Sequence, residues 1–338
     1  MVPEKTKIEI GDIEVRCPVL LAPMSGVSDL PFRRLAHQLG AQFVVSEMVA
    51  CGEFIKGRPD VQQRALGRDL APFVIQLVGH DPYWMAEAAR RCADFGADII
   101  DINMGCPARE VTGKQSGSAL MRKIPLATQI IESVVGAVSL PVTLKMRLGW
   151  DRGSQNAPEL AVIAQNSGVE MLTVHGRTRC DFFKGSADWS AVRAVTDVVT
   201  LPVIVNGDVA TFDDLSLSLA QSGAQGAMIG RGAYGAPWQP ARLSEHWAKG
   251  ADPGRPSVAE IGRIALEHVQ AMLSHYGVFL GLRNSRKHIA WYLDQGLLSV
   301  DDTKAWRRRL CTSEEPQDVL SGLSEFFSVC QEKSEVGV

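Results

Sequence analysis

Eight short apolar runs are distributed through the first 232 residues, and each leads into a polar or glycine-containing stretch. Segments with helical spacing separate them. Continuous apolar strands that alternate with helices indicate a parallel sheet covered by helices. Eight such units in about 230 residues predict a closed α/β barrel of the TIM (β/α)8 type, whose usual length is about 250 residues. The runs are VLLAPM (19–24), FVVSEM (43–48), FVIQLVG (73–79), DIIDINMG (98–105), PVTLKMR (141–147), MLTVHGR (171–177), PVIVNGD (202–208) and GAMIGRG (226–232).

A doubly wound open sheet is the competing architecture. It is disfavoured because the first run is followed by PMSGVSD (23–29), which lacks the GxGxxG turn of dinucleotide-binding sheets. Ahead of the first run, KIEIGDIEV (7–15) alternates apolar and polar residues around Gly11-Asp12. This pattern predicts a small hairpin that plugs the N-terminal face of the barrel.

The composition of the sequence changes after the eighth unit. The stretch KGADPGRPS (249–257) is rich in Pro and Gly and is typical of a linker. Ser257 with Glu260 forms a capping-box pattern that opens a helix to about Gly277, and helical spacing resumes over 281–295. A weaker start signal combines Ser299 with Asp302. The predicted organisation is a barrel domain over 1–248, a linker over 249–257 and a helical domain over 258–338.

Composition narrows the class of function. The chain is 46% hydrophobic and 22% charged, which is ordinary for a globular protein. Its net charge of -3 argues against a uniformly basic nucleic-acid coat, yet Gly281–Arg309 holds seven cationic against three acidic side chains. No apolar run approaches the roughly 20 residues of a membrane span, so we expect a cytoplasmic protein without a membrane or an obligate protein partner. The seven scattered cysteines predict neither a disulfide framework nor a metal site.

In a (β/α)8 barrel, residues at the C-terminal ends of the strands surround the active site. The turns Asn206-Gly207-Asp208 and Gly230-Arg231-Gly232 follow the seventh and eighth strands, where such barrels commonly bind a phosphate. We therefore expect a phosphorylated cofactor or substrate. The strand ends nominate Pro23, Met24, Glu47, Gln76, Asn103, Lys145, His175, Asn206, Asp208, Gly230 and Arg231.

Lys145 ends a strand that should be buried, so its ammonium must find a partner or change its pKa. Three roles remain open from the residues alone. Lys145 could face an anionic ring or phosphate, act as the Schiff-base nucleophile of an aldolase-like enzyme, or form an ion pair with Glu47. His175 is likewise either a hydrogen-bonded core histidine or a residue of the site.

Nine stretches together resemble the tRNA-dihydrouridine synthases, and most closely the bacterial B-type branch. They follow the family order over nearly the whole chain, and the block around MGCP is the most specific. The stretches are APMSGVSDLPFRRL (22–35), VSEMV (45–49), IQLVG (75–79), DINMGCPAREVTGKQSGSALM (101–121), PVTLKMRLGW (141–150), TVHGRT (173–178), PVIVNGD (202–208), AMIGRGAYGAPW (227–238) and RKHIAWYL (286–293).

The resemblance implies an FMN-dependent enzyme that uses NADPH to reduce the C5=C6 bond of uridines in tRNA. Hydride from the flavin would reach C6, and Cys106, which matches the family's proton donor, would protonate C5. A thiol with an ordinary pKa of about 8.5 is mostly protonated at neutral pH, so it can serve as a general acid without a partner base. The competing interpretations of Cys106 are a buried inert thiol and an adventitious redox site.

The resemblance also assigns the flavin-binding residues and the substrate residues. Ser25 replaces the alanine common among relatives, and Gln115-Ser116 replaces a Leu-Ala pair. The flavin would be bound by Pro23, Met24, Ser25, Gln76, Lys145, His175, Asn206, Gly207, Asp208, Gly230 and Arg231. Asn103 would orient the target uracil.

A uridine in folded tRNA must be extruded to reach a barrel mouth, with the rest of the RNA held by shape and phosphate contacts. We predict a basic track for this purpose, made of Arg109, Lys114, Arg177, Lys184, Arg283, Arg286 and Lys287. Two other classes of function remain: an FMN barrel that acts on a small molecule, such as a dihydroorotate or ene reductase, and a non-redox barrel, either an aldolase using Lys145 or an idle RNA-binding module.

Overall fold

The computed structural model describes residues 7–295 and 297–336. Eight parallel strands form one sheet in the order β3-β10-β9-β8-β7-β6-β5-β4. The sheet closes where Leu21 bridges Val44 and donates its N–H to the carbonyl of Phe43 at 2.9 Å, which confirms the predicted barrel. The strands are β3 (Val19–Leu21), β4 (Val49–Ala50), β5 (Val74–Val78), β6 (Ile99–Met104), β7 (Val142–Arg147), β8 (Met171–His175), β9 (Val203–Asn206) and β10 (Gly226–Ile229).

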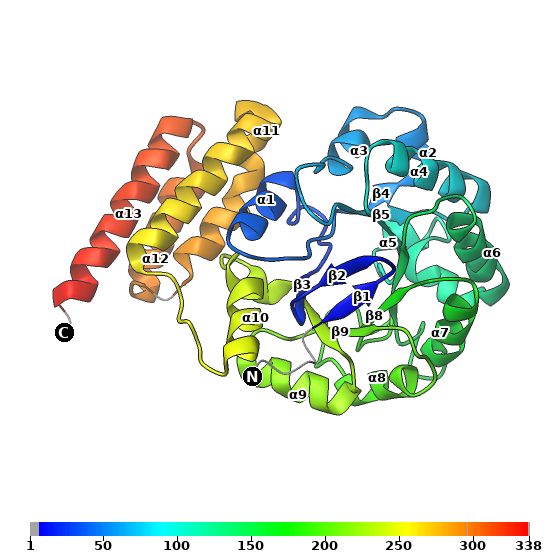
Figure 1. Ribbon diagram of the computed structural model, residues 1–338. Coiled ribbons are helices and arrows are strands. Elements are labelled where there is room, and N and C mark those ends of the chain that lie inside the picture. The colour runs from blue at the N-terminus through cyan, green and yellow to red at the C-terminus, as the bar shows by residue number, and fades with distance from the viewer. Residues whose placement is uncertain (1–6, 296, 337–338) are drawn as a thin grey trace.

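Helices surround this sheet as an outer ring (Figure 1). Several begin at a side-chain cap: Asp29, Asp81 and Asp188 each accept a backbone N–H of the first turn that they precede. The helices are α1 (Leu30–Gln38), α2 (Cys51–Ile55), α3 (Pro59–Arg64), α4 (Pro82–Asp94), α5 (Arg109–Thr112), α6 (Ile124–Val135), α7 (Ala157–Asn166), α8 (Trp189–Thr196), α9 (Phe212–Ser222) and α10 (Gln239–Lys249), with 3-10 turns η2 (Gly117–Arg122) and η3 (Arg231–Ala233).

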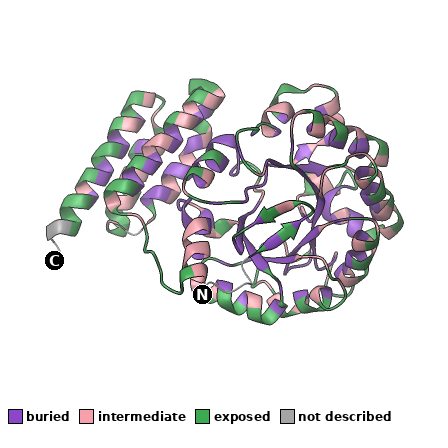
Figure 2. Ribbon diagram, in the orientation of Figure 1, coloured by how far each residue is buried: buried purple, intermediate pink, exposed green. Residues whose placement is uncertain are grey.

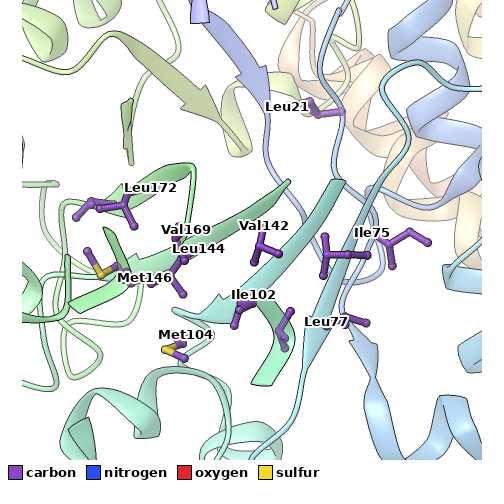
Figure 3. Packing of buried hydrophobic residues seen from close by; sticks show 14 of the residues in the cluster. Leu21, Ile75, Leu77, Ile102, Met104, Val142, Leu144, Met146, Val169 and Leu172 are labelled. Carbon is purple, nitrogen blue, oxygen red and sulfur yellow. The ribbon is translucent and has the colours of Figure 1, made fainter. Parts of the chain in front are cut away.

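The main core lies between the strands and this ring of helices. Figure 3 shows alternate side chains of β5, β6 and β7, among them Leu77, Ile102 and Leu144, within it. Figure 2 shows the strands of the eight-stranded sheet buried and the outer helix faces exposed. Because successive strand residues point to opposite faces, the residues between these apolar ones point into the barrel. The two-residue period therefore decides which side chains are available to a site.

The predicted hairpin is present as β1 (Ile8–Ile10) and β2 (Ile13–Val15), paired antiparallel. Gly11 makes the turn with a φ of +57°. The hairpin lies across the open end of the barrel that faces the viewer in Figure 1. Its apolar side chains pack with inward residues at the N-terminal ends of the strands, including Leu20, Met171 and Met228. The hairpin therefore plugs the N-terminal face, as predicted.

The second strand differs from its prediction over 43–48. Val44 and Val45 make single bridges only, and the regular strand β4 begins later, at Val49. The hydroxyl of Ser46 accepts the N–H of Gln76 at 2.9 Å and donates to the carbonyl of Glu47. A side chain thus replaces a backbone acceptor at this point, and the regular ladder is interrupted.

Three long helices follow the barrel: α11 (Val258–Leu293), α12 (Val300–Thr312) and α13 (Pro316–Val336). The capping box of Ser257 and Glu260 is confirmed in both directions. Gly277 interrupts α11 with a φ of 74° and a ψ of 171°, where the sequence predicted the helix to pause. The three helices share their own apolar core, which reaches Leu35 of α1. No helix in the described ranges is long and apolar enough to cross a membrane.

Candidate active site at the barrel mouth

Strand register brings four predicted polar residues together at the C-terminal end of the barrel, in two successive rows. Asn103 lies opposite Lys145 across the β6–β7 pair. His175 lies opposite Asn206 across the β8–β9 pair, and opposite Arg147 across the β7–β8 pair. All five side chains are at most 9% exposed. Sequence positions more than 100 residues apart therefore form a single polar surface facing the mouth.

A buried hydrogen-bonded chain leads from the middle of the barrel to these residues. Thr143 donates to Asp101 at 2.6 Å, and the amide nitrogen of Gln76 donates to the other oxygen of Asp101 at 2.6 Å. The amide oxygen of Gln76 in turn accepts from Asn103 Nδ2 at 2.8 Å. Burial raises the pKa of Asp101 to about 6, and its hydrogen bonds oppose that shift. The chain fixes the orientation of the Gln76 and Asn103 amides.

Cys106 stands in the turn directly after β6, and its backbone is held from two sides. Its N–H donates to Asn103 Oδ1 at 3.0 Å. Its carbonyl accepts from the Ser118 hydroxyl at 2.8 Å and from the Ser118 N–H at 3.1 Å. Gly117, with a φ of +60°, makes this closeness possible, because a Cβ there would lie 2.9 Å from the Cys106 carbonyl oxygen. The glycine and serine of the GSAL segment therefore position the cysteine.

The thiol of Cys106 is partly buried. Burial raises its pKa, while a backbone hydrogen bond and the cations Arg147 and Lys145 act in the opposite direction. A thiol with a raised pKa keeps its proton at neutral pH. The Cys106 thiol is therefore protonated at neutral pH, which is the state that a general acid requires.

Lys145 does not pair with Glu47. Its ammonium donates to Asn206 Oδ1 at 2.9 Å, and Asn206 in turn donates to the carbonyl of Met228. Glu47 instead accepts the backbone N–H of Gly26 at 2.5 Å. Burial, followed by the charge of Arg147, lowers the pKa of Lys145 to about 8. The ion-pair interpretation is thus wrong, because the partner of the ammonium is a neutral amide oxygen.

His175 is almost fully buried among cations. Burial, and then the charges of Arg147, Lys145, Arg177 and Arg231, hold the pKa of His175 well below its usual range, so the ring is neutral. Its Nε2 lies 3.3 Å from Arg177 Nη1, which can only donate. Gly207 packs against the ring, since a Cβ at this position would lie 2.9 Å from the His175 Cδ2 atom. No larger residue fits between the ring and this turn.

The two glycine-bearing turns after β9 and β10 meet through Asp208. Asp208 accepts from Arg231 at 2.7 Å and from Arg177 through both of its oxygens, the latter at 2.5 and 3.0 Å. The side chain of Arg231 is 52% exposed, whereas that of Arg177 is 2% exposed. Two guanidinium groups against one carboxylate leave positive charge at the predicted phosphate position.

This arrangement corrects the role predicted for Arg177. Besides Asp208, its guanidinium donates to the carbonyls of Lys184 and Gly185. A side chain so enclosed cannot contact RNA on the surface, and Arg177 instead fixes the loop after β8. Arg177 is therefore no longer counted among the cations of the basic track.

The loop that contains Pro23, Met24 and Ser25 completes the mouth beside β10. The N–H of Met24 donates to the Ser28 hydroxyl at 2.7 Å, and the Ser28 N–H returns a bond to the Met24 carbonyl. Ser25 is exposed. A Cβ on Gly230 would lie 3.4 Å from the Met24 sulfur, so the loop passes within van der Waals distance of the end of β10. The loop itself therefore lies at the mouth, and its contacts to a flavin stay a prediction.

The remaining members of the basic track divide into two groups. Arg109, which begins α5, is exposed at the mouth, as are Lys114 and Lys184 on loops. On α11, Arg283 is exposed, and Arg286 and Lys287 are half-buried. Across 7–295 and 297–336, no ion pair involves any of these six residues.

Of the other four cations in the basic C-terminal stretch, all but Arg308 are already paired among the described residues. Lys304 pairs with Asp301 and Arg309 with Glu325. Arg307 pairs with Asp294. The local positive excess is therefore concentrated on the second half of α11.

Two features of the site were not predicted. Arg147 is 1% exposed and donates to the carbonyls of Gly105, Thr178 and Phe182, which ties the cysteine turn to the loop after β8. The two-residue period from Lys145 could have indicated it.

The second feature is a stack around Trp150, where the guanidinium carbons of Arg122 and Arg179 each lie 4.6 Å from the ring centroid. Arg122 ends the loop that begins at Cys106, and Arg179 also donates to Thr112 of that loop at 3.4 Å. The stack therefore braces the cysteine loop at two points. No local pattern in the sequence marks these partners.

Comparison with known proteins adds the family. A profile described as "Dihydrouridine synthase (Dus)" matches residues 20–331. The "Probable tRNA-dihydrouridine synthase" of Rhodobacter capsulatus is 51% identical over 323 residues, which cover 95% of this chain and 98% of that protein. "tRNA-dihydrouridine synthase B" of Pseudomonas putida is 40% identical over 322 residues, which cover 95% and 94% of the two chains.

Among solved structures, histamine dehydrogenase from Rhizobium sp. 4-9 is similar with a TM-score of 0.56 at 12% identity, covering 96% of this chain and 64% of that one. A 2-naphthoyl-CoA reductase complex has a TM-score of 0.56 at 11% identity, covering 72% and 52%. At such identities the likeness shows the fold alone. The profile match and the two close relatives show that this chain belongs to the dihydrouridine synthase family.

Proposed function

We propose that this protein reduces the C5=C6 bond of uridines in tRNA to 5,6-dihydrouridine, with FMN bound at the barrel mouth and NADPH as electron donor. The observation that carries the proposal is the placement of Cys106. Its protonated thiol stands beside fixed amides and cations in a barrel whose family is defined by this reaction. The reaction belongs in the cytoplasm, where tRNA is found.

The residues present suit FMN. Lys145 offers a buried cation that would favour negative charge on a reduced flavin ring, and the second N–H of the Gln76 amide can reach ring oxygens. The backbone of the turn at Gly230 and the exposed guanidinium of Arg231 suit a phosphate. When bound and reduced, FMN supplies the hydride.

Saturation of C5=C6 needs a proton at C5 once hydride has been delivered to C6. Cys106 supplies this proton: its S–H bond breaks as the C5–H bond forms, and the electron pair remains on sulfur. Arg147 and Lys145 lie near enough to favour the resulting thiolate, since both lower the pKa of the thiol. Solvent then returns a proton to the sulfur. Asn103 keeps the cysteine turn in place through this cycle, and its remaining N–H is free for the uracil.

The tRNA approaches the mouth by its phosphates. The unpaired cations Arg109, Lys114 and Lys184 lie on the barrel side, and Arg283, Arg286 and Lys287 lie on α11. This distribution on two domains supports binding of a folded RNA across the junction, with the target uridine extruded between them.

The test follows bound flavin by visible absorbance. The purified protein is reduced anaerobically with NADPH, and unmodified tRNA is added to the wild type and to Cys106→Ala. Rapid reoxidation in the wild type and much slower reoxidation in the variant would support the proposal. If the reduced flavin is not reoxidised when tRNA is added, a small-molecule reductase is favoured. If the protein binds no FMN, the cofactor assignment is refuted.

A further inference from the structure

Three consecutive apolar side chains stand exposed where α11 is interrupted. Val278 is 56% exposed, Phe279 76% and Leu280 48%. We call these three residues the apolar tip. Three exposed large hydrophobic side chains in a row on a well-packed domain indicate a contact surface.

The chain is built to project this tip. Gly277 adopts a φ of 74°, which favours glycine, and it breaks α11 just before the tip. Gly281 follows the tip and is buried. A Cβ at this position would lie only 2.8 Å from the Leu273 Cα atom, so the backbones before and after the tip are in close contact. The second half of α11 therefore folds back closely against the first half. The three residues between the two glycines therefore lie at the corner where the first half of α11 meets the second.

Two contacts place the corner at the rim of the barrel mouth. Tyr276 donates to Asp29, the cap at the mouth-side end of α1, at 3.0 Å. Gln63 of α3 donates to the carbonyl of His275 at 3.0 Å. Farther along α11, the Lys287 ammonium lies 3.9 Å from the position that a Cβ on Gly26 would take, in the loop after β3. The second half of α11 therefore runs along the rim.

Charge beside the tip indicates the kind of partner. Phe279, Arg283 and Lys287 are spaced four residues apart, so they share one face of the helix. Neither cation on this face has an ion-pair partner within the described ranges. An exposed aromatic ring in line with unpaired cations suits a polyanion that also offers flat apolar faces, which is single-stranded or locally unstacked nucleic acid.

We propose that the apolar tip packs against a tRNA base next to the extruded uridine, while Arg283 and Lys287 bind the flanking phosphates. The inference rests on the proposed function and deepens it. Extruding a uridine removes a stacking partner from its neighbours, which costs free energy. An apolar wedge at the mouth offsets that cost because base stacking on an aromatic ring tolerates any sequence.

The test compares Phe279→Ala with the wild-type holoenzyme in binding to unmodified tRNA over a range of salt concentrations. We expect affinity to fall by about 5- to 150-fold, the range for losing one stacked base. The slope of log affinity against log salt should stay unchanged, because no charge is removed. Phe279→Trp should restore binding. Leu217→Ala removes an exposed apolar side chain from α9 and should bind as the wild type does.

Equal affinity of Phe279→Ala and the wild type for tRNA would overturn the inference. So would sedimentation showing that the substitution turns a dimer into a monomer without changing tRNA affinity, since the tip would then serve self-association. Failure of the wild type itself to bind tRNA or to reoxidise its flavin with it would instead refute the proposed function. Flavin content and unfolding temperature confirm that each variant is folded.

Discussion

The N–H of Cys106 donates to Asn103 Oδ1 at 3.0 Å, so a strand side chain fixes the turn that carries the thiol. Replacing Asn103 with Ala would leave this N–H and that of Gly105 without their acceptor. We expect tRNA-dependent flavin reoxidation to slow by roughly 100-fold, the order of loss for a misplaced reacting group. Stopped-flow absorbance measures it. Asn103→Asp keeps the acceptor and should retain more activity; if both variants were equally slow, the acceptor would not be the reason.

Cys106 should keep its proton well above neutral pH, because burial raises the pKa of its thiol. Proton donation is then intact at pH 7 and is lost as the pH rises through the raised pKa. At pH 7.5 we expect iodoacetamide to modify Cys106 more slowly than the exposed Cys180, and the difference to shrink in alkali. Peptide mapping by mass spectrometry follows both sites, with Cys106→Ala as the control. Faster alkylation of Cys106 at pH 7.5 would contradict the assignment.

Lys145 should make stability depend on pH in a window between about 8, its pKa in the folded protein, and 10.5, its ordinary value. In that window the unfolded chain holds a proton that the folded protein has released, so the free energy of unfolding rises with pH, by at most about 1.4 kcal/mol per pH unit. Urea unfolding at pH 8 and pH 10 measures the rise. In Lys145→Met this contribution should disappear. Identical pH dependence in the two proteins would show that Lys145 is not desolvated.

Arg177 should matter to stability and not to RNA contact. Arg177→Ala would leave Asp208 with Arg231 alone as its cation, and the carbonyls of the loop after β8 would lose their donor. We expect the free energy of unfolding to fall by about 1–3 kcal/mol. Lys184→Ala removes an exposed cation from the same loop and should change it by less than about 0.5 kcal/mol. Chemical denaturation distinguishes them. An Arg177→Ala protein as stable as the wild type but weaker in tRNA binding would return Arg177 to the basic track.

The corrected track should dominate the salt dependence of binding. The triple variant Lys114→Ala, Lys184→Ala and Arg283→Ala removes three unpaired cations. We expect the salt slope to decrease in magnitude by roughly 0.7–0.9 for each RNA phosphate that the variant no longer neutralises. Arg309→Ala is the matched control, since Arg309 already pairs with Glu325. A triple variant with the wild-type slope would rule the track out.

The sequence predicted the parts of the molecule that follow from short-range patterns. The alternation of apolar strands with helices was sufficient for the barrel, and the positions of Lys145 and Asn103 at the C-terminal ends of their strands placed both at the mouth. The capping box at Ser257 marked the start of α11. Each of these depends on neighbouring residues and on backbone geometry that the sequence displays directly.

What could not be predicted depends on partners far apart in the chain. The sequence predicts Arg177 as a surface cation, whereas in the structure it is buried and binds Asp208, which lies 31 residues later in the chain. Ser46 interrupts a strand because its hydroxyl meets the backbone of Gln76, 30 residues away. The partners of Trp150 come from two different loops. Polar residues whose bonding spans the fold carry no local periodicity, so only the folded structure shows which surface they face.

The hairpin of β1 and β2 gives the barrel a closed floor. A molecule that reaches Lys145 or Cys106 must leave through the opening by which it entered. Under the proposed function, the nucleotide that donates electrons and the RNA that accepts them enter by the same opening. Their binding is therefore mutually exclusive. Initial rates measured at several fixed concentrations of one substrate should then give parallel double-reciprocal lines, the signature of two half-reactions separated in time.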